Sequence, residues 1–228
     1  MYNDYNLNEI QMEVICTHGA VVPQGATSIA SGFDIRARGF SEVVDGKVED
    51  PCWFGESVKN TDYLVESGAI LDPARARGEL YSEYVLMPGQ SVLIKTGLQI
   101  KLPKPRPIYN TIKHEFEDGS THDVETLMGY IALEAQVRPR SGLALKNKIT
   151  VLNTPGTIDN DYRNDYGVIL INHSDKPFII NANDRIAQCV FNQVFVPISE
   201  KIFKQVDEFT PELENERDMK GFGDSGVK

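Results

Sequence analysis

The chain has 228 residues, of which 41% are hydrophobic and 25% are charged, a composition typical of a soluble globular protein with one sizeable core. The formal net charge of -10 at pH 7 argues against general nucleic-acid binding, because a duplex binder needs a basic face. No run of about 18 apolar residues could span a bilayer, and the first residues are acidic where a secretory signal is basic and then apolar. We therefore expect a cytosolic protein, in the host cytosol if the gene is carried by a phage or virus, with no membrane or nucleic-acid partner.

Short runs rich in β-branched and aromatic residues recur along the chain, separated by turn residues such as Pro88-Gly89. In chain order they lie at 12–16 (MEVIC), 33–37 (FDIRA), 83–87 (EYVLM), 91–102 (SVLIKTGLQIKL), 130–137 (YIALEAQV), 149–152 (ITVL), 166–172 (YGVILIN), 177–181 (PFIIN) and 186–198 (IAQCVFNQVFVPI). The pattern predicts an all-β sandwich or barrel, with at most one short helix near SGLALKN at 141–147.

Two segments, about 41–82 and about 105–128, are longer than ordinary hairpin loops and are expected to be insertions on the β core. The Pro-rich, modestly basic stretch KPRPIYNTIKH at 104–114 predicts a solvated loop. From about 199 to 228 the chain is acidic and contains Pro211 and several glycines, which favours an extended C-terminal arm. We therefore expect one domain, 1–228, that carries two insertions and an arm.

The three cysteines, Cys16, Cys52 and Cys189, are odd in number and widely spaced. They show neither a disulfide framework nor the Cys/His spacing of a structural zinc site. Reduced thiols are expected.

The stretch GTIDNDYRNDYGVILIN at 156–172 places three aspartates and two tyrosines in eight positions before an apolar run. We expect a hairpin in which GTID and YGVILIN are the strands and the polar tip is a candidate site. Asp159 and Asp161 would then share one face of a strand, while Asn160 would point to the other. From composition alone, a hairpin tip that is merely solvated is the ordinary alternative.

Five motifs together resemble those of the homotrimeric deoxyuridine triphosphatase (dUTPase) family, in that family's order. They are SGFDIRA (31–37), RPRSGLA (138–144), NTPGTIDNDYRNDYG (153–167), DRIAQ (184–188) and R-x-x-x-GFG-x-SG (217–226). The resemblance covers the core and the tail but neither insertion. It implies a jelly-roll-like β-sandwich or barrel of the dUTPase type, a homotrimer, and Mg²⁺-dependent hydrolysis of dUTP to dUMP and pyrophosphate.

The resemblance also assigns roles around the nucleoside. Asp159 matches the general base that activates a water molecule, and Tyr162 matches the platform under the deoxyribose. The positions that match the uracil slot or contact the nucleoside are Asn153, Gly156, Thr157, Ile158 and Gly167. Asp161 has no matched role, and we expect it to pair with Arg185.

Further matches surround the phosphates. Arg140, Ser141, Gly142 and Gln188 match phosphate-binding residues, and Asp34 matches the residue that holds Mg²⁺ through water. In the arm, Arg217 matches the arginine that reaches the terminal phosphate, while Phe222, followed by Gly223, matches the aromatic lid over the uracil. Without the resemblance, PRSG would be as typical of a surface turn, and Gln188 of a cross-strand hydrogen bond.

Two other functions stay open at this point. A dCTP deaminase would share the fold, but that family places a glutamate where this chain has Ile169. A regulatory or binding protein would use the insertions as a partner surface, with Trp53 and Phe54 as anchors. The alternative for these two aromatic residues is that they pack the first insertion onto the core.

Overall fold

The computed structural model describes residues 11–56, 81–116 and 119–198. Residues up to Val196 form one compact unit, and Pro197–Lys228 form a second unit, of which only residues 197–198 are described. The predicted lid residues Arg217, Phe222 and Gly223 therefore lie outside the described residues. In the part of the chain that is described, no helix is long and apolar enough to cross a membrane.

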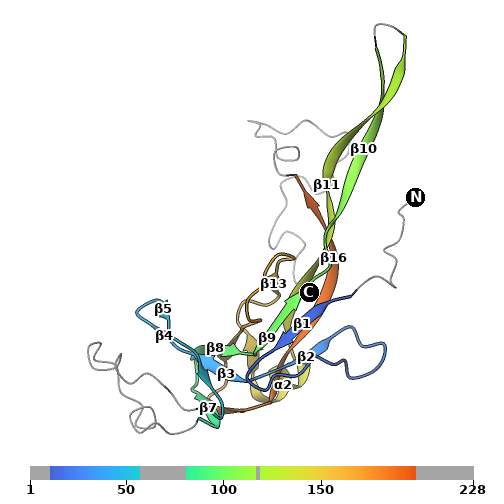
Figure 1. The fold of residues 1–228 in the computed structure, drawn as a ribbon. Helices are drawn as coiled ribbons and strands as arrows, with labels where there is room; N and C mark the ends of the chain where they lie inside the picture. Colours follow the sequence, from blue (N-terminus) through green and yellow to red (C-terminus); the bar gives the residue numbers. More distant parts are fainter. Residues whose placement is uncertain (1–10, 57–80, 117–118, 199–228) are drawn as a thin grey trace, which may run out of the picture. The chain divides into compact units, whose positions relative to one another are not determined.

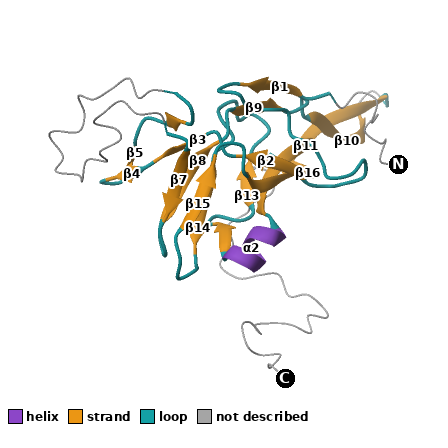
Figure 2. Cartoon of the chain, turned by 90° about the horizontal axis from the view of Figure 1, so that it is seen from below, coloured by secondary structure: helices purple, strands orange, loops and turns teal. Residues whose placement is uncertain are grey.

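Strands dominate the described unit (Figures 1 and 2). One five-stranded sheet has the order β10-β11-β16-β2, and β13 pairs with β11 off this path. Its strands are β2 (Phe33–Arg36), β10 (Arg106–Glu115), β11 (Thr121–Pro139), β13 (Gly156–Ile158) and β16 (Arg185–Pro197).

A second five-stranded sheet has the order β12-β14-β8-β3-β6. Its strands are β3 (Gly39–Ser41), β6 (Cys52–Trp53), β8 (Ser91–Lys95), β12 (Ile149–Val151) and β14 (Val168–Asn172). Three two-stranded sheets pair β1 (Glu13–Cys16) with β9 (Leu98–Lys101), β4 (Val43–Val44) with β5 (Lys47–Val48), and β7 (Glu83–Leu86) with β15 (Phe178–Asn181).

Alternating apolar residues of these strands form a single hydrophobic core. In β8 and β14 the buried apolar positions are Val92 and Ile94, and Val168 and Leu170, which matches the two-residue period of a strand. Each such side chain contributes roughly 1.5–3 kcal/mol when it is removed from water. The all-β prediction is confirmed, and the predicted helix is α2 (Ser141–Asn147).

The predicted loop at 104–114 is wrong from residue 106 on, because Arg106–Glu115 form β10. They pair antiparallel with β11, so that His114 lies opposite His122. Most side chains of β10 are exposed, as the polar composition indicated. Ile108 and Ile112 carry the strand signal in the segment, and the prolines and charges around them conceal it.

The predicted hairpin of GTID and YGVILIN is also wrong. β13 pairs with β11, with Gly156 opposite Val137, whereas β14 pairs with β8 and β12. The polar stretch between β13 and β14 is therefore a connection between two sheets. Strand propensity located both strands, but it does not specify which strand each one pairs with.

Trp53 and Phe54 of the first insertion both contact other aromatic rings of the protein, as the alternative to partner anchors predicted. Phe54 is buried and contacts Phe40, with ring centroids 6.0 Å apart. Trp53 stacks on His18 with a centroid separation of 3.7 Å. The anchor hypothesis is wrong for Phe54, which is buried, and stays untested for the half-buried Trp53. All three cysteines are described, and none forms a disulfide.

Candidate functional site

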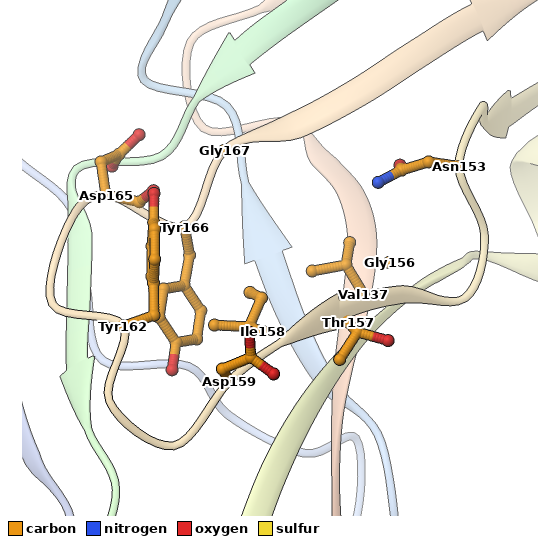
Figure 3. A pocket seen from close by; sticks show the side chains of 10 residues that line it. All are labelled: Val137, Asn153, Gly156, Thr157, Ile158, Asp159, Tyr162, Asp165, Tyr166 and Gly167. Carbon is orange, nitrogen blue, oxygen red and sulfur yellow. The ribbon is translucent and has the colours of Figure 1, made fainter. Parts of the chain in front are cut away.

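A pocket of about 230 Å³ opens where β13 runs into the 159–167 connection (Figure 3). The pocket is lined by Val137, Asn153, Gly156, Thr157, Ile158, Asp159, Tyr162, Asp165, Tyr166 and Gly167. Seven residues outside the arm were matched to the general base, the deoxyribose platform or the uracil slot and its nucleoside contacts, and all seven are in this set. The sequence analysis gave no role to Val137, Asp165 or Tyr166.

β13 contributes one wall of the pocket through its main chain. It pairs with β11 along one edge, and within the described residues no strand pairs with its other edge. Gly156 is buried, and a Cβ added there would lie 3.1 Å from the side-chain amide nitrogen of Asn153. The absence of a side chain at Gly156 thus leaves room for Asn153 to pack against the strand.

Asp159 follows directly after β13 and is exposed at the pocket. Its carbonyl oxygen accepts a hydrogen bond from the amide of Tyr162 at 3.1 Å, which closes a turn. Because residues 159–161 form a turn and not a strand, Asp159 and Asp161 do not share a strand face. Asp161 is exposed and does not line the pocket.

Asn160 anchors this turn to the protein body. Its side-chain amide donates hydrogen bonds of 3.0 Å to the carbonyl oxygens of Pro103 and Leu133. The guanidinium of Arg163 donates to the carbonyl oxygens of Asn160 and Tyr162, at 2.6 and 2.9 Å. Asn160 therefore holds the loop, while Asp159 faces the pocket.

Two tyrosines stand side by side in the pocket wall, with ring centroids 6.2 Å apart (Figure 3). Tyr166 is fully buried, and its hydroxyl donates to the carbonyl oxygen of Ile100 at 3.3 Å. Burial raises the pKa of Tyr166 well above its usual value, so this residue is neutral. Tyr162 is 42% exposed and presents its ring to the pocket.

A second polar cluster joins three segments that are distant in sequence. Asp34 of β2 accepts the Nε–H of Arg140 at 2.9 Å on one oxygen and an N–H of Arg185 at 3.1 Å on the other. Arg140 also donates to the carbonyl oxygen of Arg185 at 3.2 Å. We call Asp34, Arg140, Arg185 and Gln188 the cation cluster. The expected pair of Asp161 and Arg185 is wrong, because Asp34 takes that place.

Gln188 lies opposite Asp34 in the pairing of β16 with β2. Its side-chain amide donates to the carbonyl oxygen of Pro139 at 2.9 Å, so the cross-strand alternative describes it in part. A Cβ added at Gly32 would collide with the end of the Gln188 side chain, which would then have to move. Ser141 and Gly142 are the first two residues of α2 and are exposed beside Arg140.

Comparisons with known proteins identify relatives of this chain. The dUTPase family model matches residues 115–226. The deoxyuridine 5'-triphosphate nucleotidohydrolase of Heliobacterium modesticaldum is 32% identical over 208 residues, which are 91% of each chain. The protein of the same name from Alkaliphilus metalliredigens is 37% identical over 177 residues, 77% of this chain and 99% of the relative.

A solved structure has the same fold. It is a mutant dUTPase of Staphylococcus bacteriophage 80alpha with dUpNHpp, which matches with a TM-score of 0.56 at 19% identity. The match covers 95% of this chain and 99% of the phage protein. On the strength of the sequence relatives, with the fold in agreement, this chain belongs to the dUTPase family.

Proposed function

We propose that this chain is a dUTP diphosphatase, which hydrolyses dUTP to dUMP and pyrophosphate. The observation that carries the proposal is the pocket, in which a main-chain edge, a tyrosine ring and one exposed carboxylate converge. The family relationship supports the same reaction.

The unpaired edge of β13 is suited to read a pyrimidine through main-chain groups. Uracil offers an N3–H donor and an O4 acceptor, whereas cytosine reverses both. A fixed set of partners that suits uracil is left unpaired by cytosine, at about 1–3 kcal/mol for each group. A slot walled by Gly156, Thr157 and Ile158 on one side and Gly167 on the other also leaves little space for the 5-methyl group of thymine.

Asp159 acts as the general base. Its carboxylate accepts a proton from a water molecule whose oxygen attacks the α-phosphorus. The bond between the α-phosphorus and the oxygen that links it to the β-phosphorus breaks, and pyrophosphate leaves with that oxygen. A positioned base of this kind contributes typically about 10²–10⁴ in rate.

The cation cluster binds the phosphates. Arg140 uses two of its nitrogens on Asp34 and on a carbonyl oxygen, and its remaining N–H donors are available to phosphate oxygens. Ser141 and Gly142 follow Arg140 in the sequence, and Gln188 lies opposite Asp34 in the sheet. Arg217, Phe222 and Gly223 of the arm complete the assignment as a lid over the phosphates and the base.

Magnesium fits this cluster as an ion held mainly by the nucleotide. Within the described residues, no group of three His, Cys, Asp or Glu side chains could hold a metal by itself. Asp34 is 21% exposed, and a carboxylate has about four lone-pair sites, of which the two arginines use two. Asp34 would hold Mg²⁺ through a water molecule, and the ion would neutralise phosphate charge.

We further propose a homotrimer, as the family resemblance implies. Exposed apolar side chains support an assembly, since Leu145 of α2 is 76% exposed and the cross-strand pair Val85 and Ile179 is 43% and 48% exposed. Light scattering coupled to size-exclusion chromatography tests the assembly. An active monomer would contradict the trimer.

A dCTP deaminase is the nearest alternative, and Ile169 argues against it because a hydrocarbon side chain cannot shuttle protons. A regulatory protein that has lost turnover is the other alternative. One experiment separates all three: the protein is incubated with Mg²⁺ and dUTP, dTTP, dCTP or UTP, and pyrophosphate and ammonia are measured. Pyrophosphate from dUTP alone is expected. Ammonia from dCTP would support the deaminase, and no product from any nucleotide would support the regulatory protein.

A further inference from the structure

The third aspartate of the stretch, Asp165, is buried and fully paired, although it lines the pocket. Its carboxylate forms an ion pair with Nζ of Lys95 at 3.1 Å. It also accepts hydrogen bonds from the hydroxyl of Thr96 at 3.2 Å and from the amide of Leu98 at 3.1 Å. Asp165 therefore ties the pocket loop to the turn between β8 and β9.

The main chain of Asp165 contacts the pocket wall, whereas its side chain contacts the core. Its carbonyl oxygen accepts the hydroxyl hydrogen of Tyr162 at 3.1 Å and the amide hydrogen of Gly167 at 2.8 Å. Figure 3 shows the Asp165 carboxylate turned away from Asp159, while the Tyr162 ring stands between the two aspartates. One residue thus joins a fixed anchor in the core to two parts of the pocket wall.

The ion pair is shielded from water, and this distinguishes it from an ordinary surface pair. The side chains of Lys95 and Asp165 are 18% and 9% exposed, whereas those of Lys101 and Glu13, paired at 2.8 Å, are 49% and 73% exposed. A shielded pair is screened little by salt, and the loss of one partner leaves an uncompensated charge. By contrast, the ring of Tyr162 is too exposed for burial alone to fix it.

We propose that Lys95 and Asp165 form a clasp that positions Tyr162 and thereby sets the preference for deoxyribose over ribose. The proposal rests on the proposed function, in which Tyr162 lies under the sugar. A ring held close to C2' leaves no room for a 2'-hydroxyl, and a ring that can move away admits it. Both residues are positioning residues, since they act on the sugar through Tyr162.

The test compares the binding of dUMP and UMP by calorimetry, together with turnover of dUTP and UTP. Asp165→Asn removes the charge but keeps the size, and Tyr162→Phe removes only the hydroxyl that bonds to Asp165. Each is expected to lower the dUMP-to-UMP affinity ratio by about threefold to tenfold, the size of one lost hydrogen bond. A merely structural defect would weaken both nucleotides equally and leave the ratio unchanged.

Three further variants separate the clasp from general stability. Lys95→Met leaves a buried, unpaired carboxylate. The double variant Lys95→Met/Asp165→Asn is therefore expected to lower the dUMP-to-UMP affinity ratio by less than the two single changes combined. Lys101→Met removes an exposed ion pair on the adjacent strand β9 and is the matched control, with no expected change in the ratio.

The two proposals fail in different ways. If the Asp165→Asn and Tyr162→Phe variants both keep the wild-type affinity ratio, the clasp does not select the sugar, even where dUTP hydrolysis is normal. If the wild-type protein releases no pyrophosphate from dUTP, the proposed function fails, while the binding ratio still reports on the clasp.

Discussion

The pocket and the cation cluster are built in opposite ways. Apart from Val137, the pocket comes from one continuous segment, 153–167. This segment is fixed to the core by hydrogen bonds that the Asn160 side chain donates and the Asp165 carboxylate accepts. The cation cluster joins residues from β2, from the end of β11 and from β16, and its arginines are already paired with Asp34. The pocket is therefore held in place by its own segment, whereas the cation cluster depends on three segments meeting, and a phosphate there would use the N–H donors that Asp34 leaves free.

The contrast extends to the individual carboxylates. Asp165 is buried and serves the structure, Asp159 is exposed and available to a water molecule, and Asp34 balances two cations. Chemically identical side chains thus have three different surroundings, and we propose a different function for each. Exchanging each carboxylate for an amide of the same size tests whether these functions are separate.

Asp159→Asn is expected to have the largest effect. The amide cannot accept a proton from the water, so turnover of dUTP should fall by about 10²–10⁴, with little change in dUMP affinity. Pyrophosphate release and calorimetry measure the two quantities. Asp161→Asn is the matched control, because Asp161 is exposed and outside the pocket. Equal losses in the two variants would contradict the assignment of the base.

Asp34→Asn is expected to lower kcat/KM for dUTP by roughly tenfold to a hundredfold, because it weakens the anchor of Arg140 and Arg185 and removes the proposed contact to metal-bound water. A Mg²⁺ titration separates the two causes. A higher half-saturating Mg²⁺ concentration would support the metal contact, and an unchanged one would leave the arginine anchor as the explanation. Asp175→Asn, in an exposed turn, is the control.

A third prediction concerns the core beneath both sites. Cys189 follows Gln188 in β16 and is fully buried, which raises its pKa from 9.0 to about 12. The folded state thus keeps the thiol neutral, while the unfolded chain ionises it near pH 9. The contribution of Cys189 to the free energy of unfolding is complete below pH 9 and is lost as the pH rises towards 12.

Urea unfolding at a series of pH values measures this loss. Cys189→Val is expected to make stability fall less steeply above pH 9, because no thiol then ionises in the unfolded chain. Cys16→Val, at an exposed position, should keep the wild-type slope. If Cys189→Val also keeps that slope, burial does not hold the thiol neutral.

Sequence reasoning located most of the pocket because its residues are contiguous. Asn153, Gly156, Asp159 and Tyr162 all lie within one motif, so their proximity in space follows from their proximity in the chain. Asp165 was missed as an anchor because its partners, Lys95 and Leu98, are about seventy positions away. Long-range ion pairs leave no local pattern to recognise.

The pairing of strands was the main error at the level of the fold. Each apolar run contains a strand, but β13 and β14 belong to different sheets. A run of β-branched residues favours an extended backbone without naming its neighbour, and the side chains of the whole core decide which strands meet. β10 was missed for the related reason that an exposed strand has no continuous apolar face.

The smallest effect is expected from shortening the hairpin of β10 and β11. This change tests whether the proposed nucleotide site is independent of the second insertion. Residues 109–115 and 121–127 pair with each other, and none of them belongs to the pocket or the cation cluster. Replacing 110–126 by Asn-Gly would join Tyr109 to Leu127 through a two-residue turn that such strands favour. Because the change is confined to an exposed segment, kcat/KM for dUTP should stay within about twofold of wild type. A much larger loss of kcat/KM, with melting temperature and oligomeric state unchanged, would mean that the hairpin acts on the nucleotide site. The pocket and the cation cluster alone would then not account for the site.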